Sequence, residues 1–322
     1  MRLSVRSAIG FRRPIERTLR FLGLRLPRIC SLGTRLKIAS EQRSAMPELP
    51  EVETIRRDLA KLVVSRKIIS VTVASLKLLR GYSPARFKQR LENRDIIGVG
   101  RRAKILILDI DSGDKLLVHL KMSGRLLYLP AAEATAKHTH LVFGLDNGFE
   151  LRFVDMRRFG YFKLVEGGRL EDVAELKSLG PEPLAAGFSE ADFKDLIKSK
   201  SGSRRVTKGL LLDQTFLAGV GNLYADEVLH VAKINPTRPV SSIKAAEAAR
   251  LYRAIREVLT EAIESRGTSF DLYVDAQGRP GRYVEKLKVY GRAGRACLKC
   301  GATLRKVRVA GRGTNYCPNC QK

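Results

Sequence analysis

The spacing of hydrophobic residues changes from helical to strand-like along the chain and then returns to helical. After Pro50, apolar residues recur every three or four positions at Val52, Ile55, Leu59 and Leu62, which predicts an amphipathic helix. Short β-rich runs separated by DSGD and DNG turns follow, namely AKILILDI, KLLVHLKM, THLVFGL and FELRFVDM. These runs predict hairpins that pack as an antiparallel β-sandwich.

A break in both patterns divides the chain. Residues 179–188, LGPEPLAAGF, contain two prolines and two glycines, which indicates a linker. Helical periodicity then runs from about Glu190 to Glu264, and the end of the chain returns to short pieces between Gly, Arg and Cys. The sequence therefore predicts an α+β multidomain protein. Its predicted parts are a leader at 1–45, a β-sandwich domain with flanking helices at 46–178, the linker, a helical domain at 189–285 and a finger at 286–322.

The charge balance predicts a polyanionic partner. The chain has 60 Lys and Arg residues against 33 Asp and Glu, a net charge of +27. Residues 1–45 account for +9 of this charge, so the rest of the chain still carries +18. An excess of this size is typical of proteins that bind nucleic acid. No apolar run approaches about 18 residues, so we expect no membrane-spanning helix.

The leader at 1–45 leaves three interpretations open. It is rich in Arg and poor in acidic residues, a composition typical of an organelle transit peptide. It is equally expected if translation starts at Met46 rather than upstream, and a third interpretation is a basic arm that stays on the working chain. Arg25 interrupts the only short apolar run, which argues against a secretory signal.

Four cysteines near the end of the chain have the spacing of a metal site. CLKC and CPNC form a C-x2-C-x16-C-x2-C pattern, which is typical of one tetrahedral zinc, with Cys297, Cys300, Cys317 and Cys320 as the ligands. Two disulfides are the alternative, but two-residue loops are poor disulfide sites. Because four cysteines complete the coordination, we expect one structural Zn²⁺. The residues between the pairs predict a basic β-hairpin that includes Arg312.

The helical part contains a candidate phosphate-binding turn. LLLDQTFLAGVGNLYADEVLHVAKI predicts a helix, a turn at Gly219 to Gly221, and a second helix with Asn222 at its N-cap. Helix N-termini bind phosphate through free backbone amides. An ordinary helical hairpin is the alternative interpretation.

Four motifs stand in order along residues 46–322. PELPEVE follows Met46, GRRAK occupies 100–104, AGVGNLYADE occupies 218–227, and the four-cysteine finger ends the chain. Together they closely resemble the bacterial formamidopyrimidine-DNA glycosylases of the helix-two-turn-helix family. The resemblance implies a bifunctional DNA glycosylase and AP lyase of base excision repair, which excises oxidised purines such as 8-oxoguanine and formamidopyrimidines and then cleaves by β- and δ-elimination.

The resemblance also implies where the enzyme acts. Its partner would be double-stranded DNA that contains oxidised bases or abasic sites, bound by a monomer, with no membrane. The expected location is the bacterial cytoplasm at the nucleoid, or an organelle if the leader directs import.

The resemblance further implies roles for single residues. The Pro47 amine, freed by removal of the methionine, would attack C1′ of the damaged nucleotide and form a Schiff base. Glu48 would supply acid chemistry, with compensation of the helix dipole as the alternative, and the same alternative applies to Glu51, expected near the pocket. Lys104 would contact the phosphate and sugar at the lesion, with a solvated strand-end lysine as the alternative. Arg312 would grip a phosphate and take part in the final elimination.

Other matched residues would handle the DNA itself. Met122, Arg157 and Phe159 resemble the family's void-filling side chains, although core packing is an alternative for Met122 and Phe159. Asn222 would pair with Arg312 on a phosphate. The chain departs from common family forms at three positions, namely Lys121 for Gly, Met156 for Pro and Asp271 for a basic residue. These departures leave the wedge-loop conformation and the lesion preference open.

Two rival functions remain at this stage. Within the class, the chain could prefer oxidised pyrimidines, as the endonuclease VIII group does. Outside the class, it would be a non-catalytic protein that binds damaged DNA if the leader stayed attached, because Pro47 would then be an amide without a free lone pair.

Overall fold

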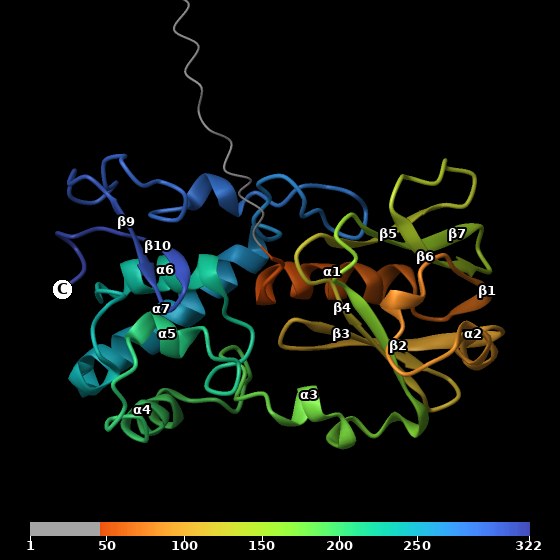
Figure 1. The fold of residues 1–322 in the computed structure, drawn as a ribbon, viewed down its shortest axis with the longest axis horizontal. Coiled ribbons are helices and arrows are strands. Elements are labelled where there is room, and N and C mark those ends of the chain that lie inside the picture. The colour runs from red at the N-terminus through yellow and green to blue at the C-terminus, as the bar shows by residue number, and fades with distance from the viewer. Residues whose placement is uncertain (1–45) are drawn as a thin grey trace, which may run out of the picture. The chain divides into compact units, whose positions relative to one another are not determined.

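The helix predicted after Pro50 forms α1, Leu49–Leu62, and buries its apolar face. Val52, Ile55 and Leu59 are at most 1% exposed, as the spacing of three and four requires. The computed structural model describes residues 46–322 (Figure 1), so the predictions for the leader lie outside the described residues.

The predicted strand runs all contain strands, within an antiparallel sheet of eight. AKILILDI, KLLVHLKM, THLVFGL and FELRFVDM contain β3, β4, β6 and β7, although β4 ends at His119 and leaves Met122 in a turn. The others, β1, β2, β5 and β8, were not singled out from the sequence. The bounds are β1 Arg66–Val73, β2 Arg94–Arg102, β3 Ile105–Ile110, β4 Lys115–His119, β5 Gly124–Pro130, β6 Thr139–Leu145, β7 Phe149–Asp155 and β8 Tyr161–Val165.

The predicted sandwich is one sheet that folds over on itself. The strand order is β5-β7-β6-β1-β2-β3-β4-β8. Strand β1 makes the connection, because Arg66 to Ile68 pair with β2 whereas Ile68 to Val73 pair with β6. Figure 1 shows the layer of β5, β6 and β7 apart from the layer of β2, β3 and β4, and α1 packs against strands of both. Between the layers, Phe153 meets Phe162 edge to face.

The sheet and its flanking helices form the first half of the described chain, which we call the sheet lobe (residues 46–177). Helices α2, Pro84–Leu91, and α3, Ala174–Lys177, belong to it. The helical lobe (residues 190–264) contains α4 Glu190–Lys198, α5 Thr207–Leu211, α6 Asn222–Val231 and α7 Ala245–Glu264. Its separate core includes Phe193, Tyr224 and Leu251, all fully buried. Within residues 46–322, none of the helices has the length and apolar character needed to cross a membrane.

The helix-turn-helix prediction is correct in type and wrong in two details. The first helix, α5, ends at Leu211, so the turn is longer than the three residues expected. The N-cap of α6 is Gly221, and Asn222 is the first helical residue. The physical reason is that the carboxylate of Glu48, directly before α1, replaces the capping side chain that Asn222 was expected to supply.

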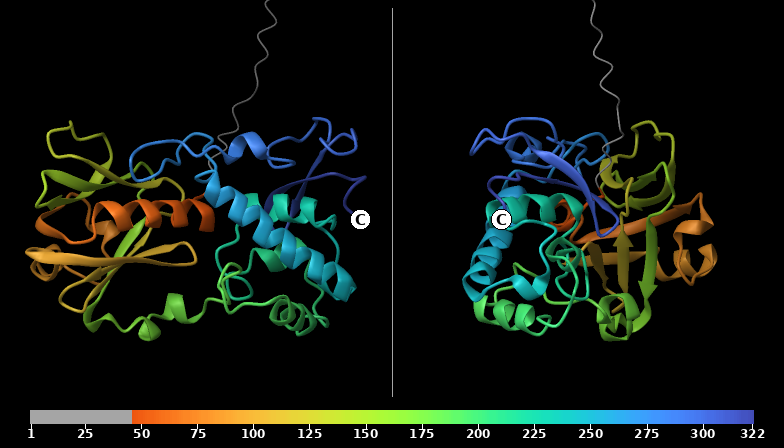
Figure 2. Two further views of the ribbon diagram at one scale, coloured as in Figure 1. Left: turned by 180° about the vertical axis from the view of Figure 1, so that it is seen from behind. Right: turned by 60° about the vertical axis from the view of Figure 1, so that its left-hand side comes forward.

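The finger (residues 297–320) holds the predicted hairpin, β9 Arg305–Val309 paired with β10 Arg312–Tyr316. Figure 2 shows this hairpin lying over α6 from two sides. Asp226 of α6 accepts hydrogen bonds from the backbone N–H of Asn315 at 2.7 Å and forms a fully buried ion pair with Lys208 at 2.6 Å. Lys208 Nζ also donates to Thr314 Oγ1 at 2.8 Å, so buried polar contacts fix the hairpin on the helical lobe.

Candidate active site

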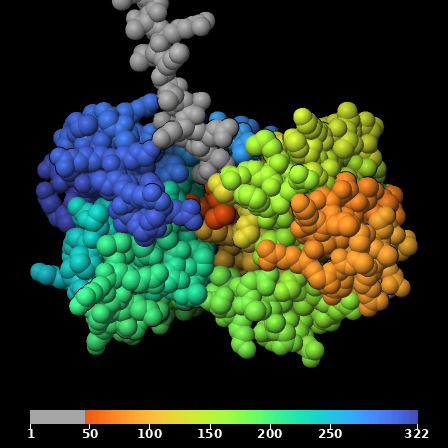
Figure 3. Space-filling view, in the orientation of Figure 1, coloured from red at the N-terminus to blue at the C-terminus, as the bar shows by residue number. Residues whose placement is uncertain are grey.

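A pocket of about 360 Å³ lies where the sheet lobe, the helical lobe and the finger meet. Figure 3 shows the first described residues, in red, at the base of a recess between the two lobes. Five residues expected from the sequence line the pocket, namely Glu48, Lys104, Met122, Asn222 and Arg312. Met46, Leu212, Gln214, Gly221 and Tyr290 complete its lining.

Glu48 caps a helix that belongs to the other lobe. One carboxylate oxygen accepts the N–H of Gly221 at 2.6 Å and the other accepts the N–H of Leu223 at 2.9 Å. These are free N–H groups at the start of α6, where the helix dipole favours a negative charge. A Cβ on Gly221 would come within 2.4 Å of the Glu48 carboxyl carbon, so only glycine allows this approach. The GVGN motif therefore seats the carboxylate of the PELPEVE motif.

Lys104 faces the same helix start from the sheet lobe. It precedes β3 directly, and its Nζ donates to the backbone carbonyl of Val220 at 3.1 Å. Glu48 is 3% exposed and Lys104 is 7% exposed. Burial raises the pKa of Glu48, partly offset by attraction to Lys104 and by the bonds from α6. Burial likewise lowers the pKa of Lys104, partly offset by Glu48 and Glu51. Each shift favours the neutral form of its group.

Glu51 lies behind Glu48, one helical turn along α1. Its carboxylate accepts the Tyr224 hydroxyl at 2.5 Å and the N–H groups of Thr268 at 2.8 Å and of Glu48 at 2.9 Å. Burial raises the pKa of Glu51 to about 7, helped by the negative charge of Glu48 and opposed by the Tyr224 hydrogen bond. Glu51 is thus a buried, fully bonded support for the segment that carries Glu48.

Pro47 lies next to the pocket rather than in its lining. It is buried and lines a separate space of about 10 Å³ together with Glu48, Glu51 and Tyr224. Met46 lines both this space and the main pocket.

Met122, Arg157 and Phe159 come together on the outside of the sheet lobe. Arg157 Nη1 is 3.2 Å from Met122 Sδ, and its guanidinium carbon lies 4.8 Å from the centre of the Phe159 ring. Phe159 is 52% exposed, which rules out core packing for this side chain. The structure thus gathers a thioether, a cation and an aromatic ring at one place beside the pocket.

Asn222 and Arg312 line the pocket from the helical lobe and the finger, with Asn222 at the start of α6 and Arg312 at the start of β10. Asn222 Nδ2 donates to the carbonyl of Gly313 at 3.2 Å, which ties the start of α6 to β10. Arg312, the first residue of β10, is exposed and lines the pocket. An exposed guanidinium in the lining of the pocket suits a phosphate.

Family models match the chain in three successive stretches. Residues 46–162 match the formamidopyrimidine-DNA glycosylase N-terminal domain, residues 179–273 match its H2TH domain, and residues 294–322 match a zinc finger found in FPG and IleRS. The formamidopyrimidine-DNA glycosylase of Pelotomaculum thermopropionicum is 45% identical over 277 residues, which cover 86% of this chain and 99% of that protein. The chain belongs to the formamidopyrimidine-DNA glycosylase family.

Further relatives and solved structures agree with this family. The enzyme of the same name from Heliobacterium modesticaldum is 45% identical and is covered over its full length by 86% of this chain. A Lactococcus lactis FPG mutant in complex with Fapy-dG-containing DNA has a TM-score of 0.80 at 36% identity, over 86% of this chain and 100% of that one. The Lactococcus lactis FPG in complex with abasic-site DNA has a TM-score of 0.79 at 36% identity, over 85% and 99%. The fold expected from the resemblance is confirmed.

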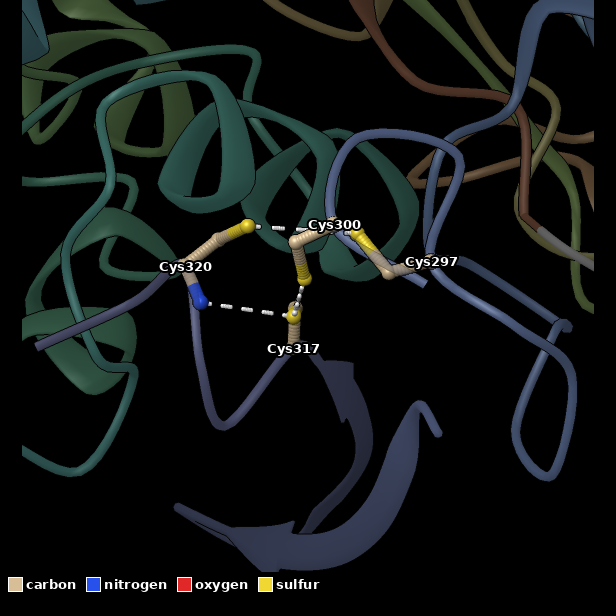
Figure 4. A group of neighbouring side chains, drawn as sticks. All are labelled: Cys297, Cys300, Cys317 and Cys320. Carbon is tan, nitrogen blue, oxygen red and sulfur yellow. Dashed lines mark hydrogen bonds between the residues drawn. The ribbon is translucent and has the colours of Figure 1, made fainter. Parts of the chain in front are cut away.

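The cysteine cluster fits the structural zinc of this family. The four sulfurs lie within 4.8 Å of one another (Figure 4), with 3.9 Å between Cys297 and Cys320 and 3.5 Å between Cys300 and Cys317. A tetrahedral site with Zn–S bonds of about 2.3 Å places its sulfurs about 3.8 Å apart, whereas a disulfide needs about 2.05 Å. The spacing therefore fits one zinc ion held by four thiolates, and the disulfide alternative does not fit.

Several polar residues in and around the pocket were missed from the sequence. Gln214 donates to the carbonyl of Val220 at 2.8 Å and accepts from Gly219 N–H at 2.9 Å, so it shapes the turn that receives Glu48. Tyr224 holds Glu51, and Glu227 accepts three backbone N–H groups from Lys288 to Tyr290 before the finger. Tyr224 and Glu227 stand inside the AGVGNLYADE motif, so their polarity within a buried helix was the available signal.

Proposed function

We propose that the chain from Pro47 onward is a bifunctional DNA glycosylase and AP lyase of base excision repair, with 8-oxoguanine and formamidopyrimidines as its main substrates. The observation that carries the proposal is that Glu48 and Lys104, both buried, meet in one pocket at the N-terminus of α6. Glu48 directly follows Pro47 in the sequence. The Lactococcus relatives solved with Fapy-dG and abasic-site DNA support the same substrate class.

Pro47 is the proposed nucleophile. As an N-terminal residue it has a secondary amine, whose lone pair attacks C1′ as the bond from C1′ to the base breaks. Opening of the sugar ring leaves an iminium ion between the Pro47 nitrogen and C1′. The iminium draws electrons from the neighbouring C2′–H bond, so loss of that proton expels the 3′ phosphate in β-elimination. Removal of a second proton expels the 5′ phosphate in δ-elimination.

Glu48 is the proposed proton carrier for ring opening. Burial raises the pKa of Glu48, which favours the protonated form, and its proton can pass to the ring oxygen of the sugar. Lys104, on the other side of the pocket, is the proposed partner of the phosphate and sugar at the lesion. Asn222 and Arg312 would hold the flanking phosphate from the helical side, and Arg312 would also assist the final elimination.

Met122, Arg157 and Phe159 are the proposed void-filling residues. Extruding a base leaves a gap in the duplex, and inserted side chains offset the loss of stacking. Their clustering beside the pocket supports this role, because a single approach of the duplex brings the gap to the wedge and the sugar to Pro47.

The start of the working chain is part of the proposal. Met46 lines both the pocket and the small space around Pro47, so its removal would join the two and open the Pro47 nitrogen to the substrate. The first family match begins at residue 46. We also keep the predicted division into a catalytic domain at 46–178, a linker, a helical DNA-binding domain at 189–285 and a finger at 286–322, acting as a monomer in the bacterial cytoplasm at the nucleoid.

Borohydride trapping tests the nucleophile. Protein expressed from Met46, and shown by intact mass to begin at Pro47, should become covalently linked to lesion-containing DNA, because hydride converts the iminium into a stable C–N bond between protein and sugar. Protein that retains residues 1–45 should not be trapped, and Pro47→Gly should retain part of the trapping through its primary amine. Efficient trapping of the full-length chain would overturn the assignment and make Lys104 the first suspect.

Oxidised pyrimidines are a second candidate substrate class. A solved Lactococcus lactis FPG complex contains DNA with an oxidised pyrimidine. Comparing single-turnover excision of 8-oxoguanine and of an oxidised pyrimidine from matched duplexes would rank the two classes.

A further inference from the structure

The proposed wedge residues come from two loops that are far apart in the sequence. Met122 lies in the turn between β4 and β5, whereas Arg157 and Phe159 lie between β7 and β8. Asp155, the last residue of β7, is completely buried next to both loops. A completely buried aspartate needs several donors, and the positions of those donors reveal its purpose.

The donors to Asp155 all belong to the two wedge loops. Its Oδ1 accepts the hydroxyl of Ser123, directly after Met122, and the N–H of Arg157 at 3.2 Å. Its Oδ2 accepts the N–H of Gly160, directly after Phe159, at 2.8 Å. Arg157 N–H is also 3.1 Å from Ser123 Oγ, which closes a small network between the loops. One carboxylate thus holds residues adjacent to all three wedge side chains.

Both loops adopt backbone conformations that their own residues do not favour. Lys121 has a φ of 54° and Arg158 also has a φ of 54°, in the left-handed region that is costly for residues other than glycine. Neither position is occupied by glycine, so the loop residues do not favour these conformations by themselves, and the contacts of Asp155 supply a constraint on both loops.

The space around the network leaves the loops little alternative. A Cβ on Gly124 would lie 2.8 Å from the ring of Phe153, and a Cβ on Gly160 would lie 2.4 Å from it. The backbone of Asp155 also takes part, since its N–H donates to the carbonyl of His138 at 3.0 Å and its carbonyl lies 3.0 Å from His140 Nε2. Asp155 is therefore fixed in place and can act as an anchor for the loops.

We propose that Asp155, together with Ser123, is a positioning residue that holds the two loops as one preassembled wedge. The side chains of Met122, Arg157 and Phe159 then enter the duplex as a unit and are not ordered one by one during base extrusion. Preassembly removes the entropic cost of ordering the three side chains from the step in which the damaged base leaves the base stack. The inference rests on the proposed glycosylase function and deepens it, because it assigns no chemistry to Asp155.

The test compares two substrates for one variant. Asp155→Asn keeps the shape of the side chain but replaces one acceptor oxygen with a donor, so one N–H or hydroxyl loses its partner. Single-turnover excision of a paired 8-oxoguanine should fall about tenfold, whereas strand cleavage at a preformed abasic site should fall less than about twofold, because little stacking has to be broken there. Ser123→Ala should change the same ratio in the same direction by a smaller factor, and it serves if Asp155→Asn folds poorly.

Asp114→Asn is the matched control. Asp114 is also buried and also holds a loop, through Arg90 and the N–H of Gly167 at 3.0 Å, but it does not contact the wedge loops. This control should lower the melting temperature without changing the ratio of the two rates. A double variant with Met122→Ala should excise no more slowly than the slower single variant, since both changes disable the same wedge.

Equal losses on both substrates, or additive losses in the double variant, would overturn the positioning role. Failure of the proposed function would be recognised separately, because the unsubstituted protein beginning at Pro47 would then leave 8-oxoguanine in place.

Discussion

The buried centre of the pocket and the exposed wedge are built in opposite ways. Glu48 and Glu51 are each 3% exposed, whereas Phe159 is 52% exposed. The centre is held by contacts between the two lobes, above all from Glu48 to Gly221 and Leu223. The loops of the proposed wedge are held within the sheet lobe by hydrogen bonds from Ser123, Arg157 and Gly160 to Asp155.

This difference follows from the role that we propose for each region. Proton transfer near neutral pH requires a carboxylate whose pKa is raised, and burial raises it. Insertion into a duplex requires side chains that meet the DNA first, so their own burial is not available to order them. The wedge therefore depends on a rigid support, whereas the centre depends on desolvation.

Glu48→Gln should separate the two regions most strongly. The amide keeps the shape of the side chain and loses the titratable proton, so excision should fall by about 10² to 10⁴. The variant should still insert its wedge, because the change lies in the other region. Equilibrium binding to lesion DNA, measured beside single-turnover excision, checks this, and a parallel loss of binding would show that Glu48 mainly holds the lobes together.

Glu51→Gln tests whether burial sets the pKa values of the carboxyl groups at the centre of the pocket. The pKa of Glu51 is about 7 in the folded protein against an ordinary value of 4.5. Between these two pH values the folded state therefore binds one proton that the unfolded state has lost. The contribution of Glu51 to stability is complete below about pH 4.5 and is lost as pH rises through about 7, an effect on the order of 3 kcal/mol. Chemical denaturation at several pH values should show this decline in the unsubstituted protein. In Glu51→Gln the decline should be smaller by this amount, because the raised pKa of Glu48 still contributes to it, and equal pH profiles would contradict the assignment.

The sequence predicted the residues and elements of both regions better than the contacts between them. Periodicity located α1 and four of the strands because their buried faces are regular. Strand β2 was missed since Gly98 and Gly100 interrupt its hydrophobic pattern. Cysteine spacing alone predicted the zinc site, because four ligands within one short segment leave little freedom.

Contacts between distant segments could not be read from local patterns. Asn222 was expected to cap its own helix, yet Glu48 caps it by accepting the N–H groups of Gly221 and Leu223, which lie 173 and 175 residues away in the sequence. The support role of Asp155 was equally hidden, because its donors lie in a second loop whose position depends on the folded sheet. Motif resemblance named Glu48 and Met122 without giving the reason why either is held in place.

Met122→Ala should affect the exposed region alone and by a smaller factor. We expect about a tenfold loss on a paired lesion and little loss at a preformed abasic site, because the wedge offsets an unstacking cost of a few kcal/mol that the abasic site largely lacks. Met156→Ala is the matched control, since it removes the same side chain from an exposed position, 53% exposed, in the other wedge loop. Similar losses on both DNA substrates would indicate general damage to the sheet lobe.

Arg312→Ala should give the smallest effect and should test a contact that belongs to neither region. Arg312 is exposed like the wedge but lines the pocket like the centre, and a phosphate contact there would help to place the backbone without reading the base. Each neutralised phosphate contributes about one unit to the slope of log affinity against log salt concentration, so the slope should fall by about one on lesion and undamaged DNA alike.

Arg308→Ala is the matched control, because Arg308 is exposed on the paired strand but does not line the pocket, and its removal should leave the slope nearly unchanged. Titrations of both variants at several salt concentrations decide the matter. A change in lesion preference with an unchanged slope would mean that Arg312 reads the extruded base, which would move this residue from backbone positioning to recognition.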